Sequence, residues 1–131
     1  MDFSFTEEQT LLRNSVSKFL ADNYKFEFFK KNSRTDPGWS PSVWKQFAEL
    51  GLMAAPLPEE HGGLGGDAVD TMIVTEELGR SLVVEPYVQT VVVGGGFIGR
   101  GTEAQKAFHL PRILSGQSWW CQGFSEPKQH H

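Results

Sequence analysis

The sequence predicts an all-α protein, an up-down or orthogonal bundle of about five to six helices with a short β-strand at its C-terminal end. Hydrophobic residues recur at helical spacing through most of the chain, with capping residues before these stretches and glycines after them. Only residues 119–124 are aromatic without a helical face, which is typical of a strand. A chain of 131 residues is long enough for one domain with its own core.

Composition excludes several classes of protein. The net charge is −4 and no basic block is present, which argues against a nucleic-acid partner. Cys121 is the only cysteine, so an internal disulfide cannot form. The longest apolar stretch, residues 91–98, is too short and too rich in glycine to span a membrane. Residues 1–4 are neither a basic signal peptide nor an Arg-rich transit peptide, and we expect a cytoplasmic protein.

The first half of the chain contains three helix signals. Thr6 and Gln9 form a capping box, which predicts a helix over about 6–23. We expect a short helical turn and then an exposed loop over 25–39. Its basic residues favour a solvated loop over an anion-binding patch. Ser40 and Pro41 begin another helix, and Gly51 ends it. Its predicted buried residues are Val43, Trp44, Phe47, Ala48 and Leu50.

Residues 56–66 form a glycine-rich loop that leads to a helix capped by Asp67. His61 has no second ligand at metal-binding spacing, so we interpret it as a loop residue. Glu76 and Glu77 are adjacent in the helix and point about 100° apart, so they cannot flank one substrate. We expect one to be solvated and the other to pair with Arg80 or a helix end. The predicted inner face of this helix consists of Val69, Met72, Ile73 and Leu78.

Residues 83–99 allow two interpretations. Glu85 and Pro86 can start a helix, and the glycines at 94–96 would let a neighbour approach its backbone closely. Alternatively, residues 94–99 fit the Gly-x-Gly-x-x-Gly fingerprint of dinucleotide-binding proteins, after a possible strand at 91–93. That fingerprint needs a helix running through its last glycines. Residues 99–102 interrupt such a helix, so we reject the dinucleotide site.

The last helix begins at a second capping box, formed by Thr102 and Gln105. Pro111 should kink it and Gly116 should end it. We expect its inner face to contain Ala104, Ala107, Phe108 and Ile113.

Three motifs near this helix resemble the acyl-CoA dehydrogenases. They are Gly-Thr-Glu-x-Gln-Lys at 101–106, Leu-Pro followed by Gly at 110–116, and an apolar strand that ends in Ser-Glu-Pro at 125–127. The glycine-rich loop at 58–65 and the acidic segment at 76–80 are also similar to that family, although His61 and the triple glycine depart from its pattern. The resemblance implies a family N-terminal helical domain at 1–117 and the start of the middle β-domain, truncated, at 118–131.

The resemblance also implies chemistry. Members of this family bind FAD and remove hydrogen from the α and β carbons of an acyl-CoA thioester. Their catalytic glutamate belongs to a C-terminal domain, so we assign no catalytic residue and no metal ligand to this chain. The family's flavin contacts correspond to Gln122, Phe124 and Ser125, although strand packing alone could explain these residues and Gln122 departs from the usual aromatic.

Two functions therefore stay open on the sequence. The first is the N-terminal domain of an FAD-dependent acyl-CoA dehydrogenase, whose full enzyme acts on acyl-CoA as a homo- or hetero-oligomer. We do not expect this chain alone to catalyse the reaction or to bind FAD. The second is a non-catalytic helical assembly or acyl-binding module related to that family.

Overall fold

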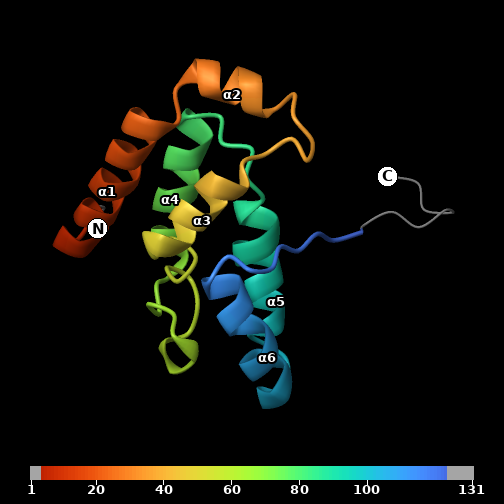
Figure 1. Ribbon diagram of the computed structural model, residues 1–131. Coiled ribbons are helices and arrows are strands. Elements are labelled where there is room, and N and C mark those ends of the chain that lie inside the picture. Colours follow the sequence, from red (N-terminus) through yellow and green to blue (C-terminus); the bar gives the residue numbers. More distant parts are fainter. Residues whose placement is uncertain (1–3, 124–131) are drawn as a thin grey trace, which may run out of the picture.

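The computed structural model describes residues 4–123, which form six α-helices, one 3-10 turn and one π-helix (Figure 1). The prediction of an all-α bundle is confirmed. The elements in chain order are α1 (Glu7–Asn23), α2 (Phe26–Asn32), α3 (Pro41–Glu49), η1 (Glu59–His61), α4 (Ala68–Arg80), η2 (Val88–Gly95), α5 (Gly96–Ile98) and α6 (Glu103–Leu114).

Side-chain caps set the starts of the long helices. The Thr6 hydroxyl accepts from the Gln9 N–H at 3.1 Å, and the Gln9 side chain accepts from the Thr6 N–H at 3.1 Å. Thr102 and Gln105 form the same capping box at the start of α6, and Asp67 caps α4. These predicted caps are confirmed. Each one satisfies backbone donors that the first helical turn leaves unpaired.

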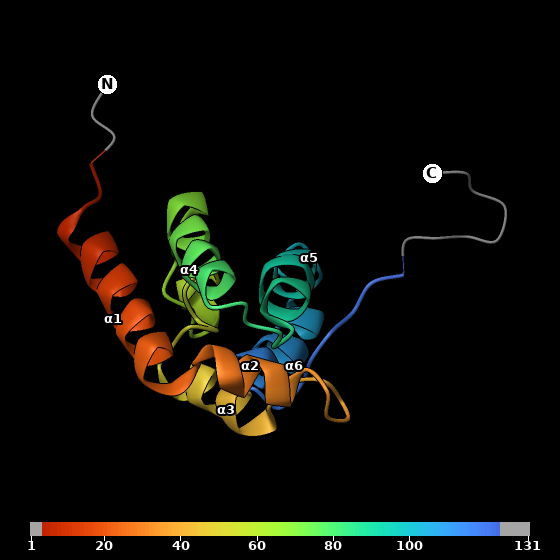
Figure 2. The ribbon, with the colours of Figure 1, turned by 90° about the horizontal axis from the view of Figure 1, so that it is seen from above.

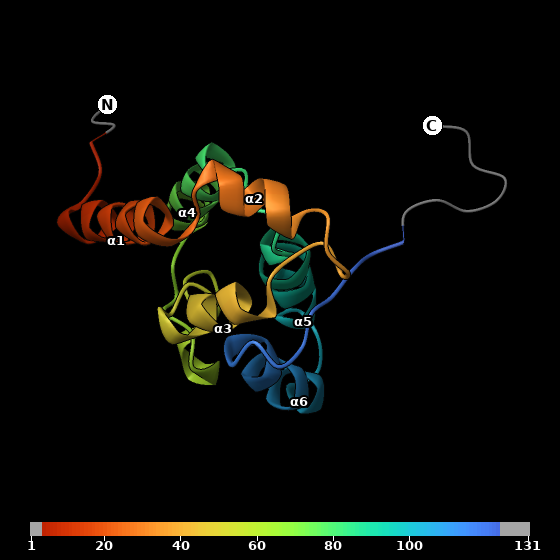
Figure 3. The same cartoon turned by 45° about the horizontal axis from the view of Figure 1, so that its top comes forward.

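The helices lie in two groups that share one core. Helix α1 lies beside α4, while η2 and α5 lie beside α6 (Figures 1 and 2). Helix α3 lies beside the C-terminal end of α6, where the Trp44 indole Nε1 donates to the Gly116 carbonyl at 3.1 Å (Figure 3). No helix within residues 4–123 is long and apolar enough to cross a membrane. The core joins residues of both groups: Val16, Leu20, Trp44, Phe47, Leu57, Val74, Val91, Ile98, Leu110 and Ile113.

The predicted inner faces of α4 and α6 are partly wrong. In α6, Ile113 is buried as expected, but Ala104, Ala107 and Phe108 are exposed and Leu110 is buried in their place. The Phe108 ring packs instead under the Arg112 guanidinium, 4.0 Å from ring centroid to Cζ. In α4, Ile73 and Leu78 are buried as predicted, whereas Val69 and Met72 are exposed.

The predicted C-terminal strand is not found in the described residues. Residues 117–123 have no regular secondary structure, and Phe124, the last residue of the expected strand, lies outside residues 4–123. A strand needs a neighbouring strand for its backbone hydrogen bonds, and the described part of the chain contains none. The Trp120 N–H donates to the Thr90 hydroxyl at 2.9 Å instead.

Candidate functional site

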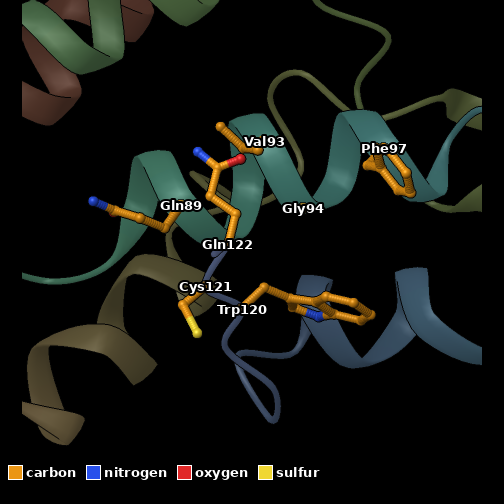
Figure 4. Close-up of a pocket in the computed structure, with 7 residues that line it drawn as sticks. All are labelled: Gln89, Val93, Gly94, Phe97, Trp120, Cys121 and Gln122. Carbon is orange, nitrogen blue, oxygen red and sulfur yellow. The ribbon is translucent and has the colours of Figure 1, made fainter. Parts of the chain in front are cut away.

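A hollow of about 250 Å³ lies between the η2–α5 helix and the segment that follows α6 (Figure 4). It brings together residues that are about thirty positions apart in the sequence. One wall comes from the helix and the other from the chain after α6. The lining residues are Gln89, Val93, Gly94, Phe97, Trp120, Cys121 and Gln122.

The helical wall is unusual because η2 is a π-helix of eight residues. Such helices have a wider turn than α-helices and occur often at functional sites. Gln89, Val93 and Phe97 follow one another at intervals of four residues along the pocket wall. At the start of this wall, the buried Tyr87 hydroxyl donates to the Leu52 carbonyl at 2.8 Å and fixes the helix to the core.

Two glycines let other parts of the chain approach η2 closely, as predicted. A Cβ atom at Gly94 would lie 3.0 Å from the Cβ of Trp120, and one at Gly95 would lie 2.7 Å from Cδ2 of Leu57. Gly96 has no such neighbour within 4 Å. The close approach therefore involves the first two glycines of the three and brings Trp120 against the helix backbone.

A second hollow of about 370 Å³ lies between the N-terminal end of η2 and the C-terminal end of α4. Gln89 lines both hollows. At this end the buried Glu85 Oε1 accepts from Asn32 Nδ2 at 3.1 Å and from the Ser40 N–H at 3.0 Å. Burial, together with the neighbouring Glu85, raises the pKa of Tyr24 to about 12. Glu85 thus connects the segments around α2 and α3 to the start of η2.

The carboxylates of α4 have structural partners. Glu77 is buried and its Oε1 lies 3.0 Å from Nε of Arg13 on α1, a pairing that the sequence analysis did not predict. Glu76 accepts from Arg80 at 2.7 Å, and this hydrogen bond lowers the pKa of Glu76. The Arg13 contact joins α1 to α4, the Arg80 contact lies within α4, and none of these residues lines the pocket.

His61 ends η1, as expected of a loop residue, and its contact with α6 is new. Its Nε2 atom lies 3.7 Å from Glu60 Oε1 and 3.7 Å from Glu103 Oε2. Within residues 4–123 no group of three or more His, Cys, Asp or Glu side chains could hold a metal ion.

The dinucleotide fingerprint at 94–99 lies inside the continuous helical segment of η2 and α5. The glycines therefore do not form the strand-to-helix turn that binds a pyrophosphate.

The family model "Acyl-CoA dehydrogenase, N-terminal domain" matches residues 6–117. The chain belongs to the acyl-CoA dehydrogenase family. The probable acyl-CoA dehydrogenase YngJ of Bacillus subtilis is 35% identical over 132 residues, which cover 97% of this chain and 34% of YngJ. The chain thus spans about a third of the length of this curated relative.

Two solved structures contain the fold of this chain within longer chains. The ChsE4–ChsE5 complex from Mycobacterium tuberculosis matches with a TM-score of 0.83 and 23% identity, over 91% of this chain and 33% of the matched one. A Bacillus anthracis acyl-CoA dehydrogenase complexed with FAD matches with a TM-score of 0.79 and 23% identity, over 97% of this chain and 22% of the matched one. The helical arrangement is therefore that of the N-terminal region of acyl-CoA dehydrogenases.

One of the three flavin-contact residues expected for an acyl-CoA dehydrogenase can be placed. Gln122 lines the pocket, and its side chain extends toward Val93 (Figure 4). Phe124 and Ser125 lie outside the described residues. Sequence reasoning did not assign Gln89, Phe97, Trp120 or Cys121 to a site. The triple glycine was the one signal that pointed to a close neighbour of this helix.

Proposed function

We propose that this acyl-CoA dehydrogenase N-terminal domain belongs to an FAD-dependent enzyme that removes hydrogen from the α and β carbons of an acyl-CoA thioester. In this proposal residues 118–131 begin the middle β-domain, and the enzyme works as a homo- or hetero-oligomer. The ChsE4–ChsE5 structure is a complex of two named components, which supports the proposal of an oligomer.

The pocket between η2 and Gln122 is the observation that carries this proposal. Its helical wall is largely apolar, and its other wall leads into the segment for which the family resemblance implies flavin contacts. Apolar walls exclude water from a reacting thioester, and a few polar groups fix the orientation of what binds. In this proposal the pocket would hold the acyl group next to one edge of the flavin.

FAD fits the residues that the chain offers. Gln122 is exposed and its amide carries both donors and an acceptor, which suit the polar edge of a flavin ring. When bound, the flavin would accept a hydride from the β carbon. The residues of this chain would orient the flavin and the acyl group and shield them from water. We assign none of them to proton abstraction.

A grafted enzyme tests the proposal. The complete chain would replace the matching third of YngJ, and the product would be purified with FAD. We expect a yellow protein whose visible flavin absorbance bleaches when an acyl-CoA is added. YngJ lacking its N-terminal third is the control, and it should show weaker acyl-CoA-dependent bleaching.

The same experiment separates this function from a non-catalytic acyl-binding module. A graft that is folded and binds FAD, but whose flavin is not reduced by any acyl-CoA from short to long chains, contradicts the enzyme proposal. If such a graft still binds acyl-CoA, the binding-module alternative becomes the better account.

A further inference from the structure

Trp120 occupies a special position in the pocket because it is the largest side chain on the wall opposite the helix. Its neighbour Trp119 points elsewhere. Trp119 is 60% exposed and meets the edge of Trp39, with ring centroids 5.5 Å apart. Two adjacent tryptophans therefore have different surroundings, and only one of them lines the pocket.

Contacts on several sides hold Trp120 in place. The Thr90 hydroxyl accepts from the Trp120 N–H at 2.9 Å and donates to the Trp120 carbonyl at 3.5 Å. Thr90 is completely buried, so water does not compete for these hydrogen bonds. The His109 ring meets the indole edge to face, with centroids 5.0 Å apart.

Gly94 lets the Trp120 side chain contact the helix backbone. A Cβ atom at Gly94 would lie 3.0 Å from the Trp120 Cβ and 3.1 Å from its Cγ, closer than most Cβ contacts in proteins. The indole base therefore rests directly on the helix backbone. Because it is held by a backbone and two hydrogen bonds, Trp120 cannot easily move aside when a ligand enters the pocket.

We propose that Trp120 is a specificity-determining residue, and that the pocket it limits takes short acyl groups in preference to long ones. The inference rests on the proposed function. The volume of about 250 Å³ is below the ~300 Å³ at which pockets for drug-sized ligands begin. A fixed indole at the wall of such a small pocket excludes additional methylene groups by contact, since close-packed neighbours leave no room for them.

The test uses the grafted enzyme with butyryl-CoA and octanoyl-CoA as substrates. Trp120→Phe keeps an aromatic ring above Gly94 and makes the wall smaller. We expect the ratio of kcat/KM for octanoyl-CoA to that for butyryl-CoA to rise about 10-fold or more, the effect of one or more newly accommodated methylenes. Trp119→Phe is the matched control and should leave the ratio unchanged.

A second pair of variants tests the inference even if Trp120→Phe does not fold. Gly94→Ala places a methyl group against Trp120, whereas Gly96→Ala places one in open space on the same helical segment. Dissociation constants for the unreactive thioether analogues of the two substrates provide a readout other than activity. We expect Gly94→Ala to weaken binding of the butyryl analogue about 10-fold and Gly96→Ala to leave it unchanged.

The two proposals can fail separately. If the parent graft reduces its flavin with acyl-CoA but Trp120→Phe changes the substrate ratio less than Trp119→Phe does, the specificity inference is overturned and the enzyme proposal stands. Equal effects of Gly94→Ala and Gly96→Ala on analogue binding overturn it as well. A folded parent graft whose flavin is not reduced removes the proposed function, and the specificity inference falls with it.

Discussion

The α1–α4 pair and the pocket region, defined as η2, α5, α6 and residues 117–123, are held together in different ways. Side chains hold the first, because Arg13 reaches the buried Glu77 across the two helices at 3.0 Å. In the pocket region, neighbouring parts of the chain come close to η2 at positions where its side chains are absent or small. Gly94 accommodates Trp120, Gly95 accommodates Leu57, and Thr90 binds the Trp120 backbone.

This difference affects how much the geometry of each region can vary. Long side chains can change rotamer, so contacts between them adjust to small shifts of the helices. A side chain seated on a helix backbone has no flexible partner that could yield. We therefore expect the pocket region to have the more sharply defined geometry, which would suit the proposed binding site.

The largest expected effect tests whether the two regions share one core. Phe47 is completely buried in α3, and its ring meets Phe19 of α1 edge to face at 5.9 Å. Phe47→Ala should lower the free energy of unfolding by about 3–5 kcal/mol because it leaves a cavity in the core. Urea unfolding followed by tryptophan fluorescence and by circular dichroism measures this effect.

Phe97→Ala is the matched control, because Phe97 is 77% exposed and should contribute little to stability. For Phe47→Ala, both probes should report one transition at the same lower urea concentration. Separate transitions for helix content and for tryptophan fluorescence would show that the two regions unfold independently, and the single shared core would be disproved.

The next effect concerns the α1–α4 pair alone. Arg13→Met keeps much of the side-chain length and removes the charge that pairs with the buried Glu77 carboxylate. Leaving this acceptor without its main partner should cost about 1–3 kcal/mol. Lys18→Met, at an exposed position of the same helix, is the control for the lost charge. Equal stability of the two variants in thermal unfolding would show that side-chain charge does not hold this pair.

Much of the fold could be predicted from the sequence because helix ends depend on local chemistry. Thr6, Ser40, Asp67 and Thr102 all cap helices as expected, because each cap forms with a residue only a few positions away. The inner face of a helix depends on what it packs against. Phe108 was predicted to be buried from its spacing alone, but α6 turns Leu110 and Ile113 to the core instead.

The pocket was harder to predict for the same reason. The close approach at Gly94 was expected from the glycines, but the sequence did not reveal that Trp120 would fill the space. A strand was expected at 119–124 because of aromatic composition. Its described part lies against Thr90 without a strand partner, since pairing partners depend on the whole fold. Gln122 was named from the family motif, and the structure places it in the pocket lining.

A smaller effect tests the pocket region. Thr90→Val keeps the shape of the side chain and removes the hydroxyl that binds the Trp120 backbone. We expect a loss of about 1 kcal/mol in unfolding free energy and faster hydrogen exchange at the Trp120 amide. Thr90→Ser retains the hydroxyl and should restore slow exchange. If valine and serine variants exchange at the same rate, Thr90 does not hold this segment.

The smallest effect is an acid-dependent contribution of Glu103 to the pocket region. The Lys106 ammonium donates to Glu103 Oε1 at 2.8 Å, and this hydrogen bond lowers the pKa of Glu103. A carboxylate whose pKa is lower when folded stabilises the protein above its unfolded pKa, about 4.3 for glutamate. That contribution is lost as the pH falls through the folded pKa.

Glu103→Gln should therefore lower Tm slightly at pH 7 and leave it unchanged in strong acid, as measured by thermal unfolding across this pH range. A Tm difference that persists at the acid end would mean that Glu103 acts through packing and not through its charge. Because Glu103 is exposed and its partner is only three residues away, the change should stay well below that of Thr90→Val, whose hydroxyl joins two distant segments without competition from water.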